Sequence, residues 1–275
     1  MKISYYNGEF LDDDKIVVNY NDRAVYFGDG VYEVVRIYDN EIFTFEEHLD
    51  RLVQSAKEIR IDIDKEEIRD IMIQMKDKNK LPNAALYIQV SRGIEGRTHL
   101  FPEKGVQPVV LSFINKVDRP IDAMRDGVKA VTRDDYRWLK CHIKSLNLLS
   151  NTLLKQEAKD SGATEAILHR DGVVTEGTST NVFAIKDGVL HTHEANNFVL
   201  NGITRQYVIK LAKSLDIPVK EKAFTVDFLK EADEAFITST TQEITPVVSV
   251  DEEKIGDGVS GEITKKLQEA FEAGI

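Results

Sequence analysis

Short hydrophobic runs occur along the chain in pairs, with turn-forming residues between the two members of a pair. Asn7-Gly8, Asp39-Asn40, Asp171-Gly172 and Asp187-Gly188 each separate two runs that are rich in β-branched or aromatic residues. Asn-Gly and Asp-Gly sequences favour tight turns in which both central residues have positive φ. The pattern therefore predicts a β-hairpin at each of these positions.

Apolar residues recur at helical spacing between these pairs. Thr44 and Glu47 are typical of a capping box at the start of one helix, and Asp64 is a candidate N-cap for the next. Ser145 is a candidate N-cap for a helix through Leu148 and Leu154. The same spacing predicts two further helices, over 204–215 and 262–271.

The order of these elements predicts the fold class. Residues 86–91 and 109–113 are predicted strands, so hairpins and helices alternate without the regular strand-helix repeat of a parallel sheet. This mixture predicts an α+β fold. A polar, proline-containing stretch at 117–121 is the best candidate linker. It divides a smaller N-terminal α/β domain, 1–116, from a larger C-terminal domain, 122–275, that carries Lys144.

Composition narrows the class of protein. The chain has 275 residues, of which 42% are hydrophobic, as is usual for a globular protein. With 36 basic and 47 acidic side chains its net charge is −11, which argues against nucleic acid as a partner. The single cysteine, Cys141, rules out an internal disulfide. No apolar run has the roughly 18 residues of a membrane span, so we expect no membrane partner and a cytoplasmic protein.

Three motifs that could bind ligands fail on inspection. Gly28-Asp29-Gly30 begins like a dinucleotide-binding fingerprint, but Glu33 stands where the last glycine belongs. His191 and His193 have no thiol or carboxylate set at metal-binding spacing, and 12–14 lacks the glycine of a calcium loop. We therefore expect no metal site.

The segment around Lys144 could carry covalent chemistry. Alternation puts Leu139, Cys141 and Ile143 on one face of a predicted short strand, which ends at Lys144 just before the Ser145 cap. An amine held at such a junction can act as a nucleophile toward a carbonyl group. On this segment alone, an ordinary surface lysine is the more common explanation.

Four other segments offer polar groups. Glu176 ends a predicted strand and leads into a hydroxyl-rich turn, and a second hydroxyl cluster follows at 238–241. The residues 201–205 open a helix, whose free N–H groups can bind an anion. Arg97 and His99 lie two apart in a glycine-containing loop, so both point the same way if the loop is extended. Each segment alone also fits an ordinary solvated loop.

Taken together and in this order, the segments resemble the fold-type IV pyridoxal-phosphate aminotransferases. The closest resemblance is to the bacterial enzymes that act on D-amino acids. The motifs that carry it are spread over nearly the whole chain: Phe27–Glu33, Glu47–Leu52, Ile143–Asn147, Thr175–Gly177, Gly202–Arg205 and Thr238–Thr241. Arg97-Thr98-His99 together with Tyr32 is typical of the D-specific subgroup.

The resemblance implies pyridoxal 5'-phosphate as cofactor and assigns the residues that hold it. Lys144 would form the Schiff base with the cofactor and later move the substrate proton as the catalytic residue. Glu176 would pair with the pyridine nitrogen and keep it protonated. Arg51 would bind the phosphate, together with the backbone N–H groups of Ile203 and Thr204 and the hydroxyl of Thr240 or Thr241. Arg51 lies opposite the apolar stripe of its helix, a position that alone predicts solvent exposure.

The resemblance also assigns the substrate site and its partner. Tyr32, Arg97 and His99 would bind the substrate α-carboxylate, with Arg97 and His99 supplied by a second copy of the chain. The implied enzyme is a homodimer that moves the amino group of D-amino acids, such as D-alanine, to 2-oxoglutarate. One departure from the closest relatives is His142, where an acidic residue is expected, and a spectator role is the simplest interpretation.

Two alternatives remain open. The first keeps the cofactor and changes the reaction, giving a branched-chain L-amino-acid aminotransferase or an aminodeoxychorismate lyase. The Tyr32, Arg97 and His99 set argues against it. The second is a non-catalytic relative, which the presence of both Lys144 and Glu176 argues against.

Overall fold

The computed structural model describes residues 2–103 and 105–275. The chain forms two compact units. The first consists of 1–118 and 143–148, and the second of 119–142 and 149–275. The segment that contains Lys144 therefore groups with the N-terminal unit, although the residues on both sides of it belong to the other. The predicted domain boundaries and the linker at 117–121 remain predictions.

A six-stranded sheet forms the centre of the described part of the first unit, in the order β2-β1-β6-β5-β3-β4. Its neighbouring strands are antiparallel, and the longest of them, β3, pairs along its whole length but one residue with β5. The strands are β1 (Ile3–Tyr6), β2 (Glu9–Asp12), β3 (Gly30–Tyr38), β4 (Glu41–Ile42), β5 (Ala84–Ser91) and β6 (Val109–Lys116).

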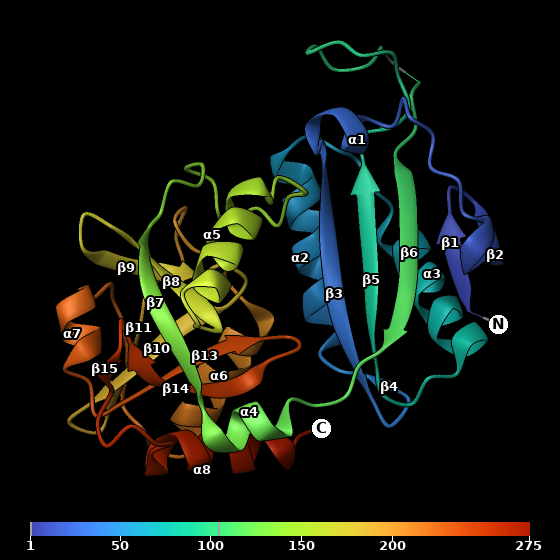
Figure 1. Cartoon of the computed structure of the whole chain (residues 1–275). Helices are drawn as coiled ribbons and strands as arrows, with labels where there is room; N and C mark the ends of the chain where they lie inside the picture. The colour runs from blue at the N-terminus through green and yellow to red at the C-terminus, as the bar shows by residue number, and fades with distance from the viewer. Residues whose placement is uncertain (1, 104) are drawn as a thin grey trace. The chain divides into compact units, whose positions relative to one another are not determined.

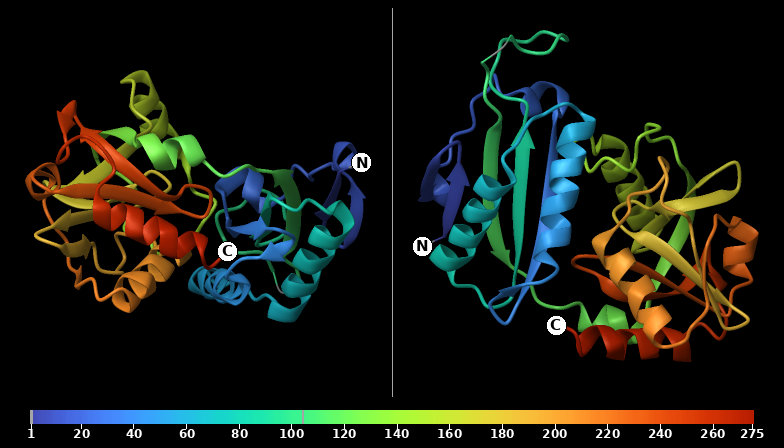
Figure 2. Two further views of the ribbon diagram at one scale, coloured as in Figure 1. Left: turned by 90° about the horizontal axis from the view of Figure 1, so that it is seen from below. Right: turned by 180° about the vertical axis from the view of Figure 1, so that it is seen from behind.

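Two long helices cover one face of this sheet, as Figures 1 and 2 show. Their buried residues join Val31, Val35 and Leu86 in one hydrophobic core, because alternate strand residues face the helices. A short helix, α1, lies at the end of the sheet where β3 begins. The helices are η1 (Asp13–Lys15, a 3-10 turn), α1 (Arg23–Phe27), α2 (Phe45–Glu58) and α3 (Lys65–Asn79).

The described part of the second unit is built on a nine-stranded mixed sheet. The order is β12-β11-β10-β13-β14-β7-β8-β9, with β15 paired to β14. Pairs β7–β8, β7–β14 and β11–β12 are parallel. The strands are β7 (Val128–Asp134), β8 (Glu165–Arg170), β9 (Val173–Gly177), β10 (Asn181–Lys186), β11 (Val189–Thr192), β12 (Val219–Glu221), β13 (Glu234–Ser239), β14 (Glu243–Val250) and β15 (Glu253–Lys254).

Helices pack on this sheet and bury a second hydrophobic core, to which Ile167, Val182 and Ile237 belong. A smaller cluster forms under α5, around Leu154 and Leu168. The helices are α4 (Ile121–Asp126), α5 (Leu149–Asp160), α6 (Ile203–Ser214), α7 (Val226–Lys230) and α8 (Glu262–Glu272). The mixture of antiparallel hairpins and packed helices confirms the predicted α+β class. No helix among the described residues is long and apolar enough to cross a membrane.

All four predicted hairpins are confirmed. They join β1 to β2, β3 to β4, β8 to β9 and β10 to β11. Both central residues of every turn have positive φ, which is the geometry of a type I′ turn: Asn7 and Gly8, Asp39 and Asn40, Asp171 and Gly172, Asp187 and Gly188.

The predicted helix starts have mixed outcomes. Asp64 caps α3, since its side chain accepts from the N–H groups of Glu66 and Glu67. The capping box at Thr44 is wrong. Thr44 has φ 49° and makes no side-chain cap bond. Its hydroxyl instead donates to the carbonyl of Phe43, at 2.8 Å.

The strand predicted through Leu139, Cys141 and Ile143 is also wrong. These residues lie in turns and bends, and within the described chain they pair with no strand. Ser145 does not cap a helix either. The helix begins at Leu149, three residues later than an N-cap at Ser145 predicts.

Candidate active site

Lys144 is held against the start of β3 by backbone hydrogen bonds. The Tyr32 N–H donates to the Lys144 carbonyl, and the Leu146 N–H donates to the Gly30 carbonyl, both at 3.0 Å. The side-chain nitrogen of Lys144 lies 4.3 Å from the centroid of the Tyr32 ring. A short bridge to a sheet strand thus fixes the backbone of Lys144, while its amine lies over an aromatic face.

Gly30 makes this close approach possible. A Cβ atom at this position would lie 2.6 Å from the Val90 carbonyl oxygen and 2.8 Å from a methyl carbon of Leu146. Any side chain at this position would therefore collide with the backbone of β5 and with the Leu146 side chain.

Arg51 is not solvated, contrary to the exposure predicted from its helix face alone. Its side chain is 12% exposed and binds the carboxylate of Glu33 through Nε at 2.7 Å and a terminal nitrogen at 2.9 Å. The same carboxylate accepts a 2.8 Å contact from Nδ1 of His48. Burial alone would raise the pKa of Glu33, but Arg51 and His48 hold this pKa well below its ordinary value. Glu33 therefore fixes the Arg51 fork as an ionised partner.

Arg97 and His99 lie in the connection between β5 and β6, which projects beyond the end of the sheet in Figure 1. Both side chains are exposed, and both contact the Phe27 ring of α1. The Arg97 guanidinium carbon lies 5.4 Å and the His99 ring 5.3 Å from the Phe27 centroid. The two residues are thus brought together. Within the described chain neither of them contacts Tyr32.

Glu176 lies at the end of β9 in the second unit and is buried. Its carboxylate accepts from Arg137 at 2.7 Å, from the Asn181 side chain at 3.1 Å and from the Leu200 N–H at 2.9 Å. Burial raises the pKa of Glu176, and the guanidinium of Arg137 opposes this rise. Three donors directed at one carboxylate hold it in one orientation. A carboxylate that is to bind a further N–H group needs such a fixed orientation.

The start of α6 lies next to the Glu176 cluster. Asn181, which donates to Glu176, also donates to the Leu200 carbonyl, and a Cβ on Gly202 would lie 2.1 Å from the Asn181 side-chain oxygen. α6 has no side-chain cap, and within the described chain the N–H groups of Ile203 and Thr204 have no acceptor. Uncapped N–H groups at a helix start are suited to an anion.

Thr240 and Thr241 follow β13, the strand that pairs with β10. Thr238 is the register partner of Asn181, which belongs to the Glu176 cluster. Thr240 and Thr241 lie two and three residues after Thr238. Both are partly buried. The second unit thus gathers Glu176, the α6 start and these two hydroxyl residues around Asn181.

Some residues that shape the site were not predicted from sequence. Glu33 occupies a core-facing position in β3, between Val31 and Val35 on the helix-covered face, and a carboxylate there signals a buried partner. His48 and Arg137 carry no such local signal. His142 is partly buried, and its spectator role stays a prediction.

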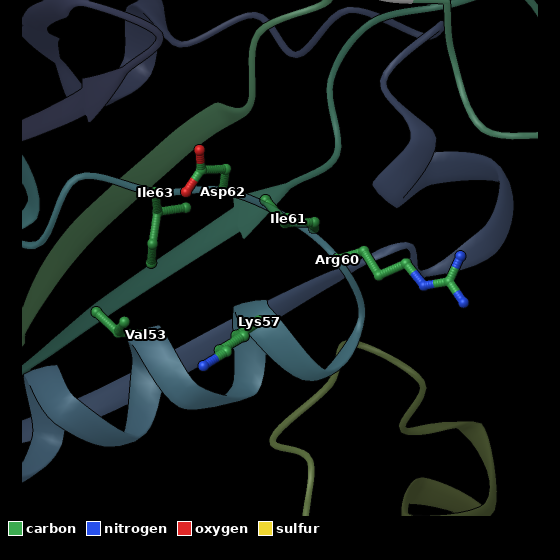
Figure 3. Close-up of a pocket in the computed structure, with 6 residues that line it drawn as sticks. All are labelled: Val53, Lys57, Arg60, Ile61, Asp62 and Ile63. Atoms are coloured by element: carbon green, nitrogen blue, oxygen red, sulfur yellow. The ribbon is translucent and has the colours of Figure 1, made fainter.

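A cavity of about 450 Å³ lies elsewhere in the first unit, at the end of α2. Figure 3 shows its lining, which α2 and the chain just after it provide: Val53, Lys57, Arg60, Ile61, Asp62 and Ile63. None of the predicted site residues lines it. Within the described residues, no group of three or more metal-ligating side chains is found.

The two units carry groups that suit different parts of a phosphorylated, nitrogen-containing aromatic aldehyde. The first unit has a primary amine at Lys144, and the second has a buried, oriented carboxylate and a helix start with free N–H groups. The amine can attack the aldehyde, the carboxylate can bind a ring N–H, and the helix start can bind a phosphate.

Comparison with known proteins identifies the family. A family model described as amino-transferase class IV matches residues 30–250. The D-alanine aminotransferase of Staphylococcus haemolyticus is 48% identical, over 97% of this chain and 95% of its own. The D-alanine aminotransferase of Bacillus licheniformis is 44% identical, over 100% of this chain and 97% of its own.

Solved structures indicate the same family. The branched-chain amino acid aminotransferase of Escherichia coli superposes with a TM-score of 0.92 at 31% identity, over 99% of this chain and 94% of its own. The T.th. branched-chain amino acid aminotransferase with pyridoxamine 5'-phosphate gives a TM-score of 0.91 at 29% identity, over 99% of this chain and 93% of its own. The family predicted from the sequence motifs is confirmed: the chain belongs to the class IV aminotransferases.

Proposed function

We propose that this protein transfers the amino group of D-amino acids, such as D-alanine, to 2-oxoglutarate. The products are a 2-oxo acid and D-glutamate, formed in two half-reactions of a ping-pong cycle. The cofactor is pyridoxal 5'-phosphate, which accepts the electron pair left when the substrate Cα loses its proton. The observation that carries the proposal is 44–48% identity over nearly the full chain to enzymes named D-alanine aminotransferase.

Lys144 is the catalytic residue of this proposal. Its amine binds the cofactor aldehyde and, once substrate has displaced it, moves the proton between the substrate Cα and the cofactor. The support is its position: the Lys144 carbonyl and the Leu146 N–H fix the backbone to β3 at Tyr32 and Gly30, while the side chain extends over the Tyr32 ring. A lysine whose backbone is fixed, and whose amine stands at the end of a long side chain, suits a group that must transfer a proton between two atoms.

The remaining proposed contacts are made to the ring and to the phosphate of the cofactor. Glu176 binds the ring N–H, supported by its three donors, which hold the carboxylate in one orientation. The N–H groups of Ile203 and Thr204 bind the phosphate with the hydroxyl of Thr240 or Thr241. Arg51 adds a guanidinium, already oriented by Glu33.

Tyr32, Arg97 and His99 bind the substrate α-carboxylate, with Arg97 and His99 supplied by the partner subunit of a homodimer. The exposed loop and its apolar surroundings support this arrangement. Leu100 is 77%, Val17 79% and Tyr20 72% exposed, and the loops carrying them are joined where the Glu95 N–H donates to the Asn21 carbonyl, at 3.1 Å. Apolar side chains exposed in such numbers are typical of an interface. We further propose that the enzyme works in the cytoplasm.

The alternative function is transamination of branched-chain L-amino acids, which the structural likeness to enzymes of that name favours. Assays of the first half-reaction distinguish the two proposed functions. The yellow holoenzyme is mixed with D-alanine or L-leucine, without an oxo acid, and the cofactor absorbance is followed. D-alanine should bleach it and L-leucine should not. Bleaching by L-leucine alone would overturn the D-specific proposal and favour the alternative.

A further inference from the structure

Asp29 lies at the centre of an ion-pair cluster in the first unit. Its carboxylate accepts from Nε and a terminal nitrogen of Arg92 and from Nε of Arg23, each at 2.8 Å. Both arginines are buried, with relative exposures of 9% and 3%. Within the described residues no other carboxylate pairs with either of them. Asp29 is thus the counter-charge of two buried guanidinium groups.

The two arginines connect Asp29 to the loop that carries Arg97 and His99. Arg23 donates through a terminal nitrogen to the carbonyl of Thr98, the residue between them, at 2.8 Å. Arg92 stands at the base of the same loop, and its N–H donates to the Asp29 carbonyl at 3.0 Å. The segment 92–99 is called the clamp loop below.

Phe27, two residues before Asp29, adds the third link. Its ring contacts the guanidinium of Arg23 at 4.8 Å, and Arg97 and His99 pack on the same ring. The side chain of Asp29 therefore sets the position of Arg23, and Arg23 touches both the backbone of the clamp loop and the ring on which its functional side chains lie.

We propose that Asp29 is the positioning residue of the clamp loop, which it holds through Arg23 and Arg92 so that Arg97 and His99 are set to bind the substrate α-carboxylate. The inference rests on the proposed function, because it takes Arg97 and His99 as the carboxylate site. It gives the Gly28-Asp29-Gly30 motif a role in substrate binding.

The contacts of the Lys144 segment are independent of the Asp29 side chain. The Gly28 carbonyl accepts from the Asn147 side chain and the Gly30 carbonyl from the Leu146 N–H, both at 3.0 Å. These are backbone acceptors on either side of Asp29. Loss of the Asp29 charge should therefore disturb the clamp loop and leave the lysine in place.

The test compares Asp29→Asn with Arg97→Ala in the holoenzyme. Asp29→Asn should raise the KM of both D-alanine and 2-oxoglutarate by about tenfold or more, with kcat changed less than about threefold, because binding of the carboxylate is lost equally in ground and transition states. The double variant should be no worse than Arg97→Ala, since both changes remove one function. Asp22→Asn is the matched control: it removes a neighbouring charge, and asparagine still caps α1, so KM should not change.

Hydrogen exchange gives a readout that does not depend on activity. In Asp29→Asn the amides of 93–99 should exchange faster, while those of 143–148 stay as in the wild type. If Asp29→Asn yields no folded protein, Arg23→Lys takes its place, because lysine keeps the ion pair with Asp29 but cannot also reach the Thr98 carbonyl. The same rise in KM is then expected.

The outcomes separate the inference from the function on which it rests. An unchanged KM in Arg97→Ala would overturn the carboxylate site itself. A raised KM in Arg97→Ala with an unchanged KM in Asp29→Asn, or in its substitute Arg23→Lys, would overturn only the positioning role. A double variant whose loss is the product of the two single losses would also overturn it, because Asp29 would then act elsewhere.

Discussion

At the scale of single residues, the buried ion pairs matter more than the surface charges. Glu33 is 1% exposed in the first unit and holds Arg51 and His48, while Glu176 is held in the second by Arg137, Asn181 and the Leu200 N–H. Removal of one partner from such a pair leaves an uncompensated charge in a poorly solvated place. These groups therefore couple the stability of the fold to the placement of the proposed cofactor contacts.

The acid dependence of stability should reveal the Glu33 pair. The ordinary pKa of this carboxyl is 4.5, and Arg51 and His48 hold the folded-state pKa well below it. Its contribution is thus fully present above about pH 4.5 and disappears as the pH falls through the folded-state pKa. Glu33→Gln should lower the free energy of unfolding at pH 7 by about 3 kcal/mol, and the difference from wild type should shrink below about pH 4.

Denaturant unfolding at a series of pH values measures this difference. Glu41→Gln, an exposed residue of the same sheet, is the control and should change stability by less than about 0.5 kcal/mol at every pH. A deficit in Glu33→Gln that stays constant down to pH 3 would show that the ionised carboxylate is not the source of the stability.

At the scale of elements, the starts of α2 and α3 in the first unit offer a direct contrast. The Asp64 side chain caps α3 with two hydrogen bonds, whereas Thr44 precedes α2 without a cap bond. Asp64→Ala should therefore lower the free energy of unfolding by about 1 kcal/mol, and Thr44→Ala by less than about 0.5 kcal/mol. Thermal or denaturant unfolding of the two variants measures both. Equal losses would contradict the cap assignment.

The elements that were predicted correctly share one property, which is that adjacent residues determine them. Asp171-Gly172 and Asp187-Gly188 form turns because their own backbone preferences match a tight hairpin. The 139–143 segment has a strand-like alternation, yet a strand needs a partner, and within the described chain these residues pair with no strand. A local pattern cannot indicate a distant partner.

The same distinction applies to the candidate site. The motifs around Lys144, Glu176 and 202–205 predicted the family, because a family signature survives in short segments. The partners of those residues could not be predicted. Glu33 meets Arg51 across 18 positions and Arg137 meets Glu176 across 39, so only the fold brings each pair together.

At the scale of the whole molecule, the proposed homodimer makes a quantitative prediction about mixed dimers. If Arg97 serves the partner's Lys144, a dimer of one Lys144→Ala and one Arg97→Ala chain contains one intact site and one site lacking both groups. Random pairing of equal amounts should then restore about a quarter of wild-type activity, since half of the dimers are mixed and each has one working site.

Co-expression of the two variants with different affinity tags allows the mixed dimers to be purified and assayed. The two parent homodimers, assayed separately, are the controls and should both be poorly active with a low concentration of D-alanine. Mixed dimers no more active than the parents would contradict the supply of Arg97 by the partner subunit.

The return of 143–148 to the first unit has a consequence for synthesis of the chain. When the ribosome has made the first 118 residues, the six strands of that unit are complete, but the segment that bonds to Gly30 and Tyr32 is still to come. The N-terminal unit can therefore close only after another thirty residues have left the exit tunnel. A nascent chain halted before Leu148 would present an unfinished edge to chaperones and proteases, and quality control at that moment would select on the segment that carries the proposed catalytic lysine.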